Sequence, residues 1–96
     1  MIPGTTTKIS EQTLASAATI YPKTDLVTLT GSTAIADIIP SYGGGSSGVL
    51  FLVPQDGTLG LLTTGNIAIA VTMPQNQVTV LVFSKENDVW YPGAIS

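Results

Sequence analysis

The side chains that could do chemistry in this chain are few, because it contains no histidine and no cysteine. Imidazole bases, thiolate nucleophiles and most transition-metal ligands are therefore missing from its sequence. The remaining candidates are six acidic residues: Glu11, Asp25, Asp37, Asp56, Glu86 and Asp88. Two carboxylates can hydrolyse a glycosidic bond when they flank it about 5–10 Å apart. Only Glu86 and Asp88 are close in sequence.

A hairpin turn is the simpler interpretation of that acidic pair. The segment 85–88 separates two apolar runs, and Asn and Asp favour such turns because they hydrogen-bond to their own backbone and tolerate unusual torsions. A calcium site built from Glu86, Asn87 and Asp88 is chemically conceivable, but the spacing of a calcium-binding loop is absent. We therefore expect no metal site, no catalytic residue and no enzymatic activity.

The glycine-rich segment 43–48 suggests phosphate binding only superficially. A P-loop ends in Gly-Lys followed by Ser or Thr, whereas Val49 and Leu50 follow here. We interpret the segment as a surface loop and expect no cofactor.

The charge balance excludes two classes of partner. The net charge is −3, and the only basic side chains are Lys8, Lys23 and Lys85. Nucleic acids and anionic membranes are bound through several Lys or Arg residues, so neither partner is expected. No apolar run approaches the roughly 20 residues that span a bilayer. The polar opening segment does not resemble a secretory signal, so we expect synthesis in a cytoplasm.

Most of the chain predicts short β-strands. Runs of β-branched and apolar residues alternate with Gly, Pro, Asn and Asp clusters. These runs cover residues 18–21, 25–30, 34–39, 48–53, 58–62, 67–73, 78–83 and 89–91. Residues 10–18 could form a helical turn by propensity alone. We therefore expect an all-β fold, a small antiparallel sandwich or barrel of about eight short strands.

Several predicted strands are apolar on both faces, as in the run 78–83. A single small sandwich should have polar outer faces, yet only 9% of the 96 residues are charged, against about a quarter in a typical domain. One alternative is an unusually efficient core within a single copy. We predict instead an obligate oligomer whose interface contains Ile67, Ile69, Val71, Val78, Val80 and Val82.

Residues 1–16 are predicted to form an extended N-terminal arm, and residues 17–96 the β-domain. A Thr-rich arm can add its backbone to an exposed sheet edge of another protein while its apolar side chains enter pockets. The residues expected to make this contact are Ile2, Pro3, Thr5, Thr6, Thr7 and Ile9. The alternative is a tail that has no partner.

Three aromatic residues are candidates for stacking on sugar rings, namely Tyr42, Trp90 and Tyr91. A lone Trp at the end of a β-domain also commonly anchors the core or a subunit contact. Both interpretations of Trp90 remain open at the level of sequence.

Five phrases occur in order from Thr13 onward: TLASAATIYP, DLVTLTGSTAIADI, a glycine-rich turn, GVLFLVPQDGTLGLLTTGNIAIA and VTVLVFSKENDVWYP. Together they cover about four-fifths of the chain. In this pattern the chain resembles a small trimeric β-domain of tailed-bacteriophage virion surface proteins. The resemblance implies a homotrimer that serves either as a module of a fibre or spike or as a capsid decoration.

The chain has neither the long repetitive shaft of a fibre nor an enzymatic spike domain, so the resemblance favours a decoration, or cement, protein. Such a trimer would sit on the outer face of the phage head, bind the major capsid protein and stabilise the capsid. Its location would be the surface of the virion. The alternative is a trimeric tail-fibre or tailspike module that binds a host surface glycan.

Overall fold

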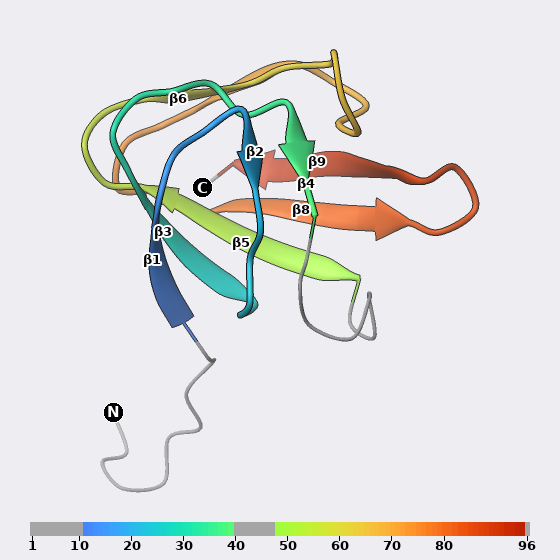
Figure 1. Cartoon of the computed structure of the whole chain (residues 1–96), viewed down its shortest axis with the longest axis horizontal. Coiled ribbons are helices and arrows are strands. Elements are labelled where there is room, and N and C mark those ends of the chain that lie inside the picture. Colours follow the sequence, from blue (N-terminus) through green and yellow to red (C-terminus); the bar gives the residue numbers. More distant parts are fainter. Residues whose placement is uncertain (1–10, 40–47, 96) are drawn as a thin grey trace, which may run out of the picture.

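The structure is a computed structural model that describes residues 11–39 and 48–95 (Figure 1). Within these residues it contains no helix. The strands found there are β1 (Glu11–Ala15), β2 (Thr19–Ile20), β3 (Leu26–Thr30), β4 (Asp37–Ile38), β5 (Val49–Pro54), β6 (Leu59–Leu61), β7 (Val71–Met73), β8 (Thr79–Ser84) and β9 (Val89–Ile95). Each predicted strand segment overlaps one of them, so the all-β prediction is confirmed.

The main sheet has five strands in the order β1-β3-β5-β8-β9. The prediction of a purely antiparallel arrangement is wrong, because β3 pairs in parallel with both β1 and β5. Antiparallel pairing is limited in this sheet to β5 with β8 and β8 with β9. Residues 11–15 of the predicted N-terminal arm form a strand of the main sheet and not the helical turn that propensity allows there, while residues 1–10 of that arm lie outside the described residues.

A second layer is built from the segments between the main-sheet strands. Strands β2 and β4 pair in parallel, and β6 pairs antiparallel with β7. Ile35 links the two pairs, since its N–H donates to the carbonyl of Gly60 and its carbonyl accepts from the N–H of Leu62. Parallel neighbours cannot be joined by a tight turn, so the chain leaves the main sheet between β1 and β3 and again between β3 and β5. Figure 1 shows β2 and β4 drawn across the main sheet near β8 and β9.

One hydrophobic core lies between the two layers. In β5 the buried positions alternate with half-buried ones, so Leu50 and Leu52 face the core. The buried hydrophobic residues are Ile20, Val27, Leu29, Ile35, Ile38, Leu50, Leu52, Leu59, Leu61, Ile67, Met73, Leu81 and Trp90. Both layers contribute to this set, which shows that the second layer covers one face of the main sheet.

Side chains complete the hydrogen bonding of β4, which is too short to be held by strand pairing alone. Asn66 accepts a hydrogen bond from the Ile38 N–H at 2.9 Å and donates one to the Ile38 carbonyl at 2.8 Å. The indole Nε1 of Trp90 donates to the same carbonyl at 3.1 Å. Asn66 and Trp90 therefore fix β4 against the core.

Strand β9 extends beyond the end that Pro92 and Gly93 predicted for it. It runs to Ile95 at the sheet edge, and its register with β8 shifts between Thr79 and Leu81. Proline is tolerated in an edge strand or beside such an irregularity, because its missing N–H is not needed there.

Gly65 supplies a test of how closely the segment before Asn66 approaches β4. A Cβ at position 65 would collide with the carbonyl oxygen of Ala36 and the carboxylate of Asp37. We expect Gly65→Ala to lower the free energy of unfolding by about 1–3 kcal/mol, measured by urea denaturation. The matched control is Gly60→Ala, whose new Cβ would lie 3.7 Å from that of Ala34, an ordinary contact. Equal losses in the two variants would contradict this account.

Candidate functional site

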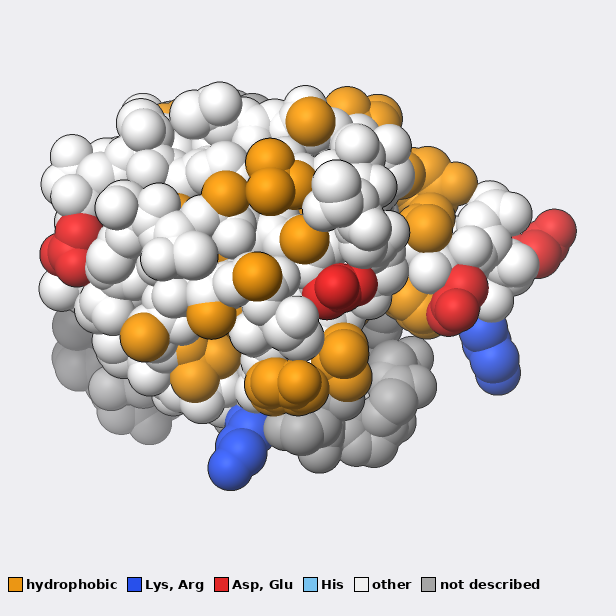
Figure 2. Space-filling model, turned by 45° about the horizontal axis from the view of Figure 1, so that its top comes forward, with side chains coloured by type: hydrophobic (Ala, Val, Ile, Leu, Met, Phe, Trp, Pro, Cys, Tyr) orange, Lys and Arg blue, Asp and Glu red, His pale blue; other side chains and the backbone are white. Residues whose placement is uncertain are grey.

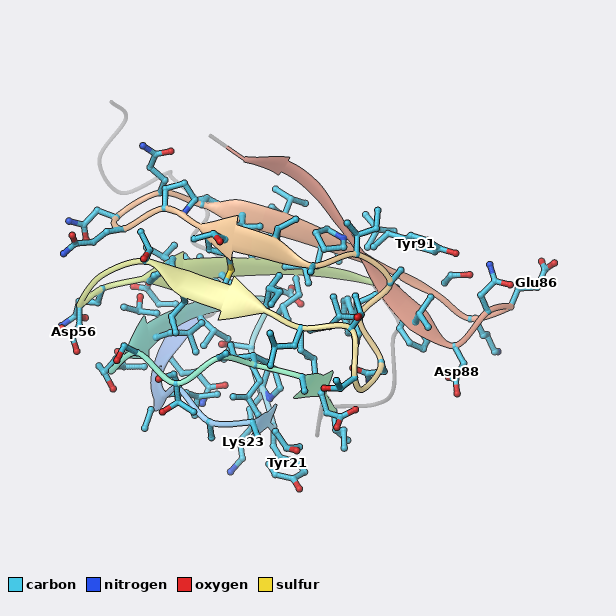
Figure 3. All side chains as sticks on the ribbon, turned by 90° about the horizontal axis from the view of Figure 1, so that it is seen from above. Tyr21, Lys23, Asp56, Glu86, Asp88 and Tyr91 are labelled. Carbon is cyan, nitrogen blue, oxygen red and sulfur yellow. The ribbon has the colours of Figure 1, made fainter. Side chains whose placement is uncertain are left out.

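The acidic residues that the sequence analysis weighed for catalysis lie in different parts of the molecule. Figure 3 places Asp56 at one end of the molecule and both Glu86 and Asp88 at the other. The Asp56 carboxylate accepts a hydrogen bond from the Gly31 N–H at 2.7 Å, and that of Asp37 accepts one from the Asn66 N–H at 3.1 Å. These two carboxylates therefore join segments that lie 25 and 29 residues apart in the sequence. Within the described residues, no group of three or more His, Cys, Asp or Glu side chains is placed to hold a metal ion.

Glu86 and Asp88 lie in the turn that joins β8 to β9, as the turn interpretation predicts. The N–H of Asp88 donates to the Ser84 carbonyl at 2.7 Å, and Asp88 has a φ of 59°. That left-handed conformation is one that Asp and Asn adopt more easily than most residues. The local sequence is thus explained by the geometry of the turn.

The aromatic residues proposed as glycan contacts separate into three environments. Trp90 is only 2% exposed and packs against Phe83 with ring centroids 5.1 Å apart, so it cannot stack on a sugar in this structure. Tyr91 is exposed, and its hydroxyl accepts a hydrogen bond from the Asn87 side chain at 3.0 Å. Tyr42 lies outside the described residues. Tyr21, which sequence reasoning missed, is 56% exposed.

The six residues predicted for the oligomer interface do not share one surface. Ile67 is buried in the core of the single chain, so its side chain is unavailable to a partner in this structure. Ile69 is 54% exposed, and Val71 packs partly against the core beside it. Val80 and Val82 lie on the face of the main sheet that points away from the core, because their neighbours Thr79 and Leu81 are buried. Val78 precedes β8 and is half-buried.

That outer face of the main sheet is a continuous apolar surface. Strand register aligns Leu26 with Phe51 and Phe51 with Val80, and it aligns Val49 with Val82 and Val82 with Tyr91. Paired residues point to the same side of a sheet. The apolar side chains of the outer face are therefore Leu26, Val49, Phe51, Val53, Val80, Val82 and Tyr91, and the threonines of β1 and β3, Thr13, Thr28 and Thr30, continue this face toward the β1 edge.

Exposure and charge distinguish the outer face from an ordinary sheet surface. Val82 is 47% exposed and Tyr91 is exposed as well, while the other five side chains are half-buried. Among the side chains described for the five strands on this side, only Glu11, at the β1 edge, is charged. None of β2, β4, β6 and β7 covers this face, because their buried side chains join the core on the opposite side.

The other side of the molecule carries smaller apolar groups. Figure 2, in which the top of Figure 1 comes forward, shows hydrophobic side chains in several separate clusters, with most charged side chains near the outline. A shallow groove of about 290 Å³ lies between β6 and β7, lined by Gly60, Leu61, Leu62, Ala70, Val71 and Thr72. It presents no charged side chain and no convergent polar groups, so it offers little for catalysis or for specific recognition.

The predicted arm contacts, Ile2, Pro3, Thr5, Thr6, Thr7 and Ile9, lie outside the described residues, as does most of the glycine-rich segment. The described part of the chain includes no helix with the length and hydropathy needed to cross a membrane. Comparisons with protein families, with curated proteins and with solved structures found no match to this chain. The functional interpretation therefore rests on the surfaces of the molecule and on the resemblance noted in its sequence.

The different roles of the two adjacent aromatic residues can be tested. Trp90→Phe removes the hydrogen bond to the Ile38 carbonyl and part of the core, so we expect the free energy of unfolding to fall by about 2–4 kcal/mol. Tyr91→Phe removes an exposed hydroxyl and should change it by less than about 0.5 kcal/mol. Both are measured by urea denaturation at one protein concentration, because self-association would make stability depend on concentration. A Trp90 variant as stable as the Tyr91 variant would contradict the anchoring role.

Proposed function

We propose that this chain is a structural protein of a phage virion, a homotrimeric capsid decoration protein that binds the outer face of the head and stabilises the shell. The observation that carries the proposal is the apolar outer face of the main sheet. The resemblance to trimeric virion surface domains supplies the biological setting. The alternative is a trimeric tail-fibre or tailspike module that binds a host glycan. That module would also self-associate, but it would lie on the tail and not on the head.

Burial of apolar surface supports self-association through the outer face. Each Å² of apolar surface removed from water contributes about 25 cal/mol, and interfaces of permanent oligomers resemble a protein core. The residues at the centre of this face, Phe51 and Val80, are uncharged and packed beside one another in register. No charged group needs to lose its water when a second copy covers them, so the desolvation cost is low.

A decoration protein acts by mass action. A ligand that binds the assembled lattice and not its separated subunits stabilises the lattice by its binding free energy. A trimer multiplies this effect, because three linked contacts dissociate together far more slowly than one. Such a function needs a rigid scaffold and binding surfaces and requires no catalytic group.

A lysine in the outer face tests self-association. We expect Val82→Lys to weaken association at least tenfold, or about 1.4 kcal/mol, measured by sedimentation across a concentration series. The side chain is already 47% exposed, so a lysine can reach water in the separated chain, and circular dichroism should report an intact β fold. The matched control is Ile69→Lys, a change at a comparably exposed residue outside the main sheet.

Two results would overturn the outer face as the association surface. One is association that survives Val82→Lys but is lost in Ile69→Lys. The other is a wild-type chain that sediments as a compact monomer at micromolar concentration.

Location on the virion tests the proposed role. Cryo-electron microscopy of intact particles that carry the chain should show threefold-symmetric density on the outer face of the head, and particles without the chain should lose their DNA at a lower temperature. Density at the tail tip, together with binding on a glycan array, would instead favour the fibre module. An unchanged release temperature in a particle shown to carry the protein on its head would contradict the stabilising role.

A further inference from the structure

The two edge strands of the main sheet, β9 and β1, differ in how far their outward-facing backbone groups are covered. At the β9 edge, the N–H of Trp90 donates to the Asn66 carbonyl at 2.8 Å, and the Trp90 carbonyl accepts from the Ala68 N–H at 2.9 Å. Segment 66–68 thus occupies part of this edge, and Pro92 supplies no N–H farther along it. Covering segments, proline and irregular register are common ways of preventing an edge strand from pairing with another chain.

The β1 edge has none of these protections. All five residues of β1 pair with β3 in uninterrupted register, and no described residue pairs with its other side. The strand contains no proline and no lysine, and only Glu11 is charged. Its outer edge therefore presents a regular row of backbone donors and acceptors that an extended segment could pair with.

Strand β1 is also held firmly enough to act as a template. Leu14 packs against the core, and the Gln12 side chain accepts a hydrogen bond from the Lys23 N–H at 2.5 Å. Just after the strand, the N–H of Ser16 donates to the Thr30 carbonyl at 2.8 Å. These contacts keep the edge in place when no partner is present.

Residues 1–10, which precede β1 directly, have the composition and length to pair with this edge. Thr5, Thr6, Thr7 and Ile9 are β-branched and suit an extended strand. Ten extended residues span at most about 33 Å, which exceeds the width of roughly 19 Å between the outer strands of a five-stranded sheet. Such an arm can therefore reach from one copy to the edge of another copy seated on the outer face.

Residues 1–10 are poorly suited to pair with β1 of their own chain. For residues 1–10 to return along β1 of the same chain, the sequence around residues 8–11 would have to form a hairpin turn. It reads Lys8, Ile9, Ser10, Glu11, without the Gly, Asn or Asp that tight hairpins require. If residues 1–10 continued β1 without a turn, they would instead meet a neighbouring copy.

We infer that, in the assembled protein, residues 1–10 of one copy pair as a strand with the open β1 edge of a second copy. The inference depends on the proposed self-association. In a threefold ring the contact is head-to-tail, arm to edge, and three such contacts close the ring. The pairing uses backbone groups, so side chains such as Ile2 and Ile9 can still contact a capsid protein, although the backbone pairing is then made with a second copy and not with the capsid.

The chain has no cysteine, so engineered pairs report this contact directly. We would place Thr13→Cys in β1 together with Thr5→Cys, Thr6→Cys or Thr7→Cys, one pair per variant, and oxidise each protein. Adjacent strands place Cα atoms about 4.5–5.5 Å apart, within the range that a disulfide bridges. At least one pair should give covalent dimers and trimers on a non-reducing gel. The matched control replaces Thr13→Cys by Thr72→Cys, at an exposed position of β7.

A second measurement is deletion of residues 1–10, which ends before β1 begins. It should weaken association at least tenfold and leave the β-sheet circular dichroism unchanged. Intrachain disulfides, or cross-links no stronger than in the control, would overturn the inference. If the cross-linking failed in this way but Val82→Lys still abolished association, only the pairing of residues 1–10 with β1 would be wrong. The interface through the outer face would remain supported. A monomeric chain would overturn both.

Discussion

The structure depends on the burial of a small sheet that is apolar on both of its faces. Burial of one face is achieved within the chain, because the segments that leave the sheet form a second layer over residues such as Leu50, Leu52 and Leu81. On the opposite face Phe51 and Val80 are only half-buried, and burial of their remaining apolar surface would favour association.

The second layer is held mainly by packing and by side-chain hydrogen bonds. Strands β2 and β4 are two residues long, so they share few backbone hydrogen bonds. Asn66 and Trp90 both bond to Ile38 and thereby join β4 to the segment between β6 and β7 and to β9. Trp90, which the sequence left open between a glycan contact and a core anchor, is therefore part of the core in this structure.

Within the described residues, the main sheet of a single copy has one face that the second layer does not cover and one edge that pairs with no other strand. Both features belong to the main sheet, and they are contiguous, since Thr13 of β1 lies beside Thr28 of β3 on the outer face. The β9 edge is closed by Trp90 and Pro92, which restricts strand addition to one side. A head-to-tail assembly needs this asymmetry, because each copy must offer two different surfaces.

The sequence by itself determined the all-β class, the approximate positions of most strands and the turn at Glu86 and Asp88, because these follow from local propensity and punctuation. It missed β1, whose residues have no clear alternation and pair only because β3 lies beside them. Which strands belong to which layer was decided by the tertiary structure alone, since strands of both layers share the same apolar composition. Ile67 and Val82 were both predicted for the oligomer interface because each lies in an apolar run. In the structure Ile67 is in the core and Val82 is at the surface.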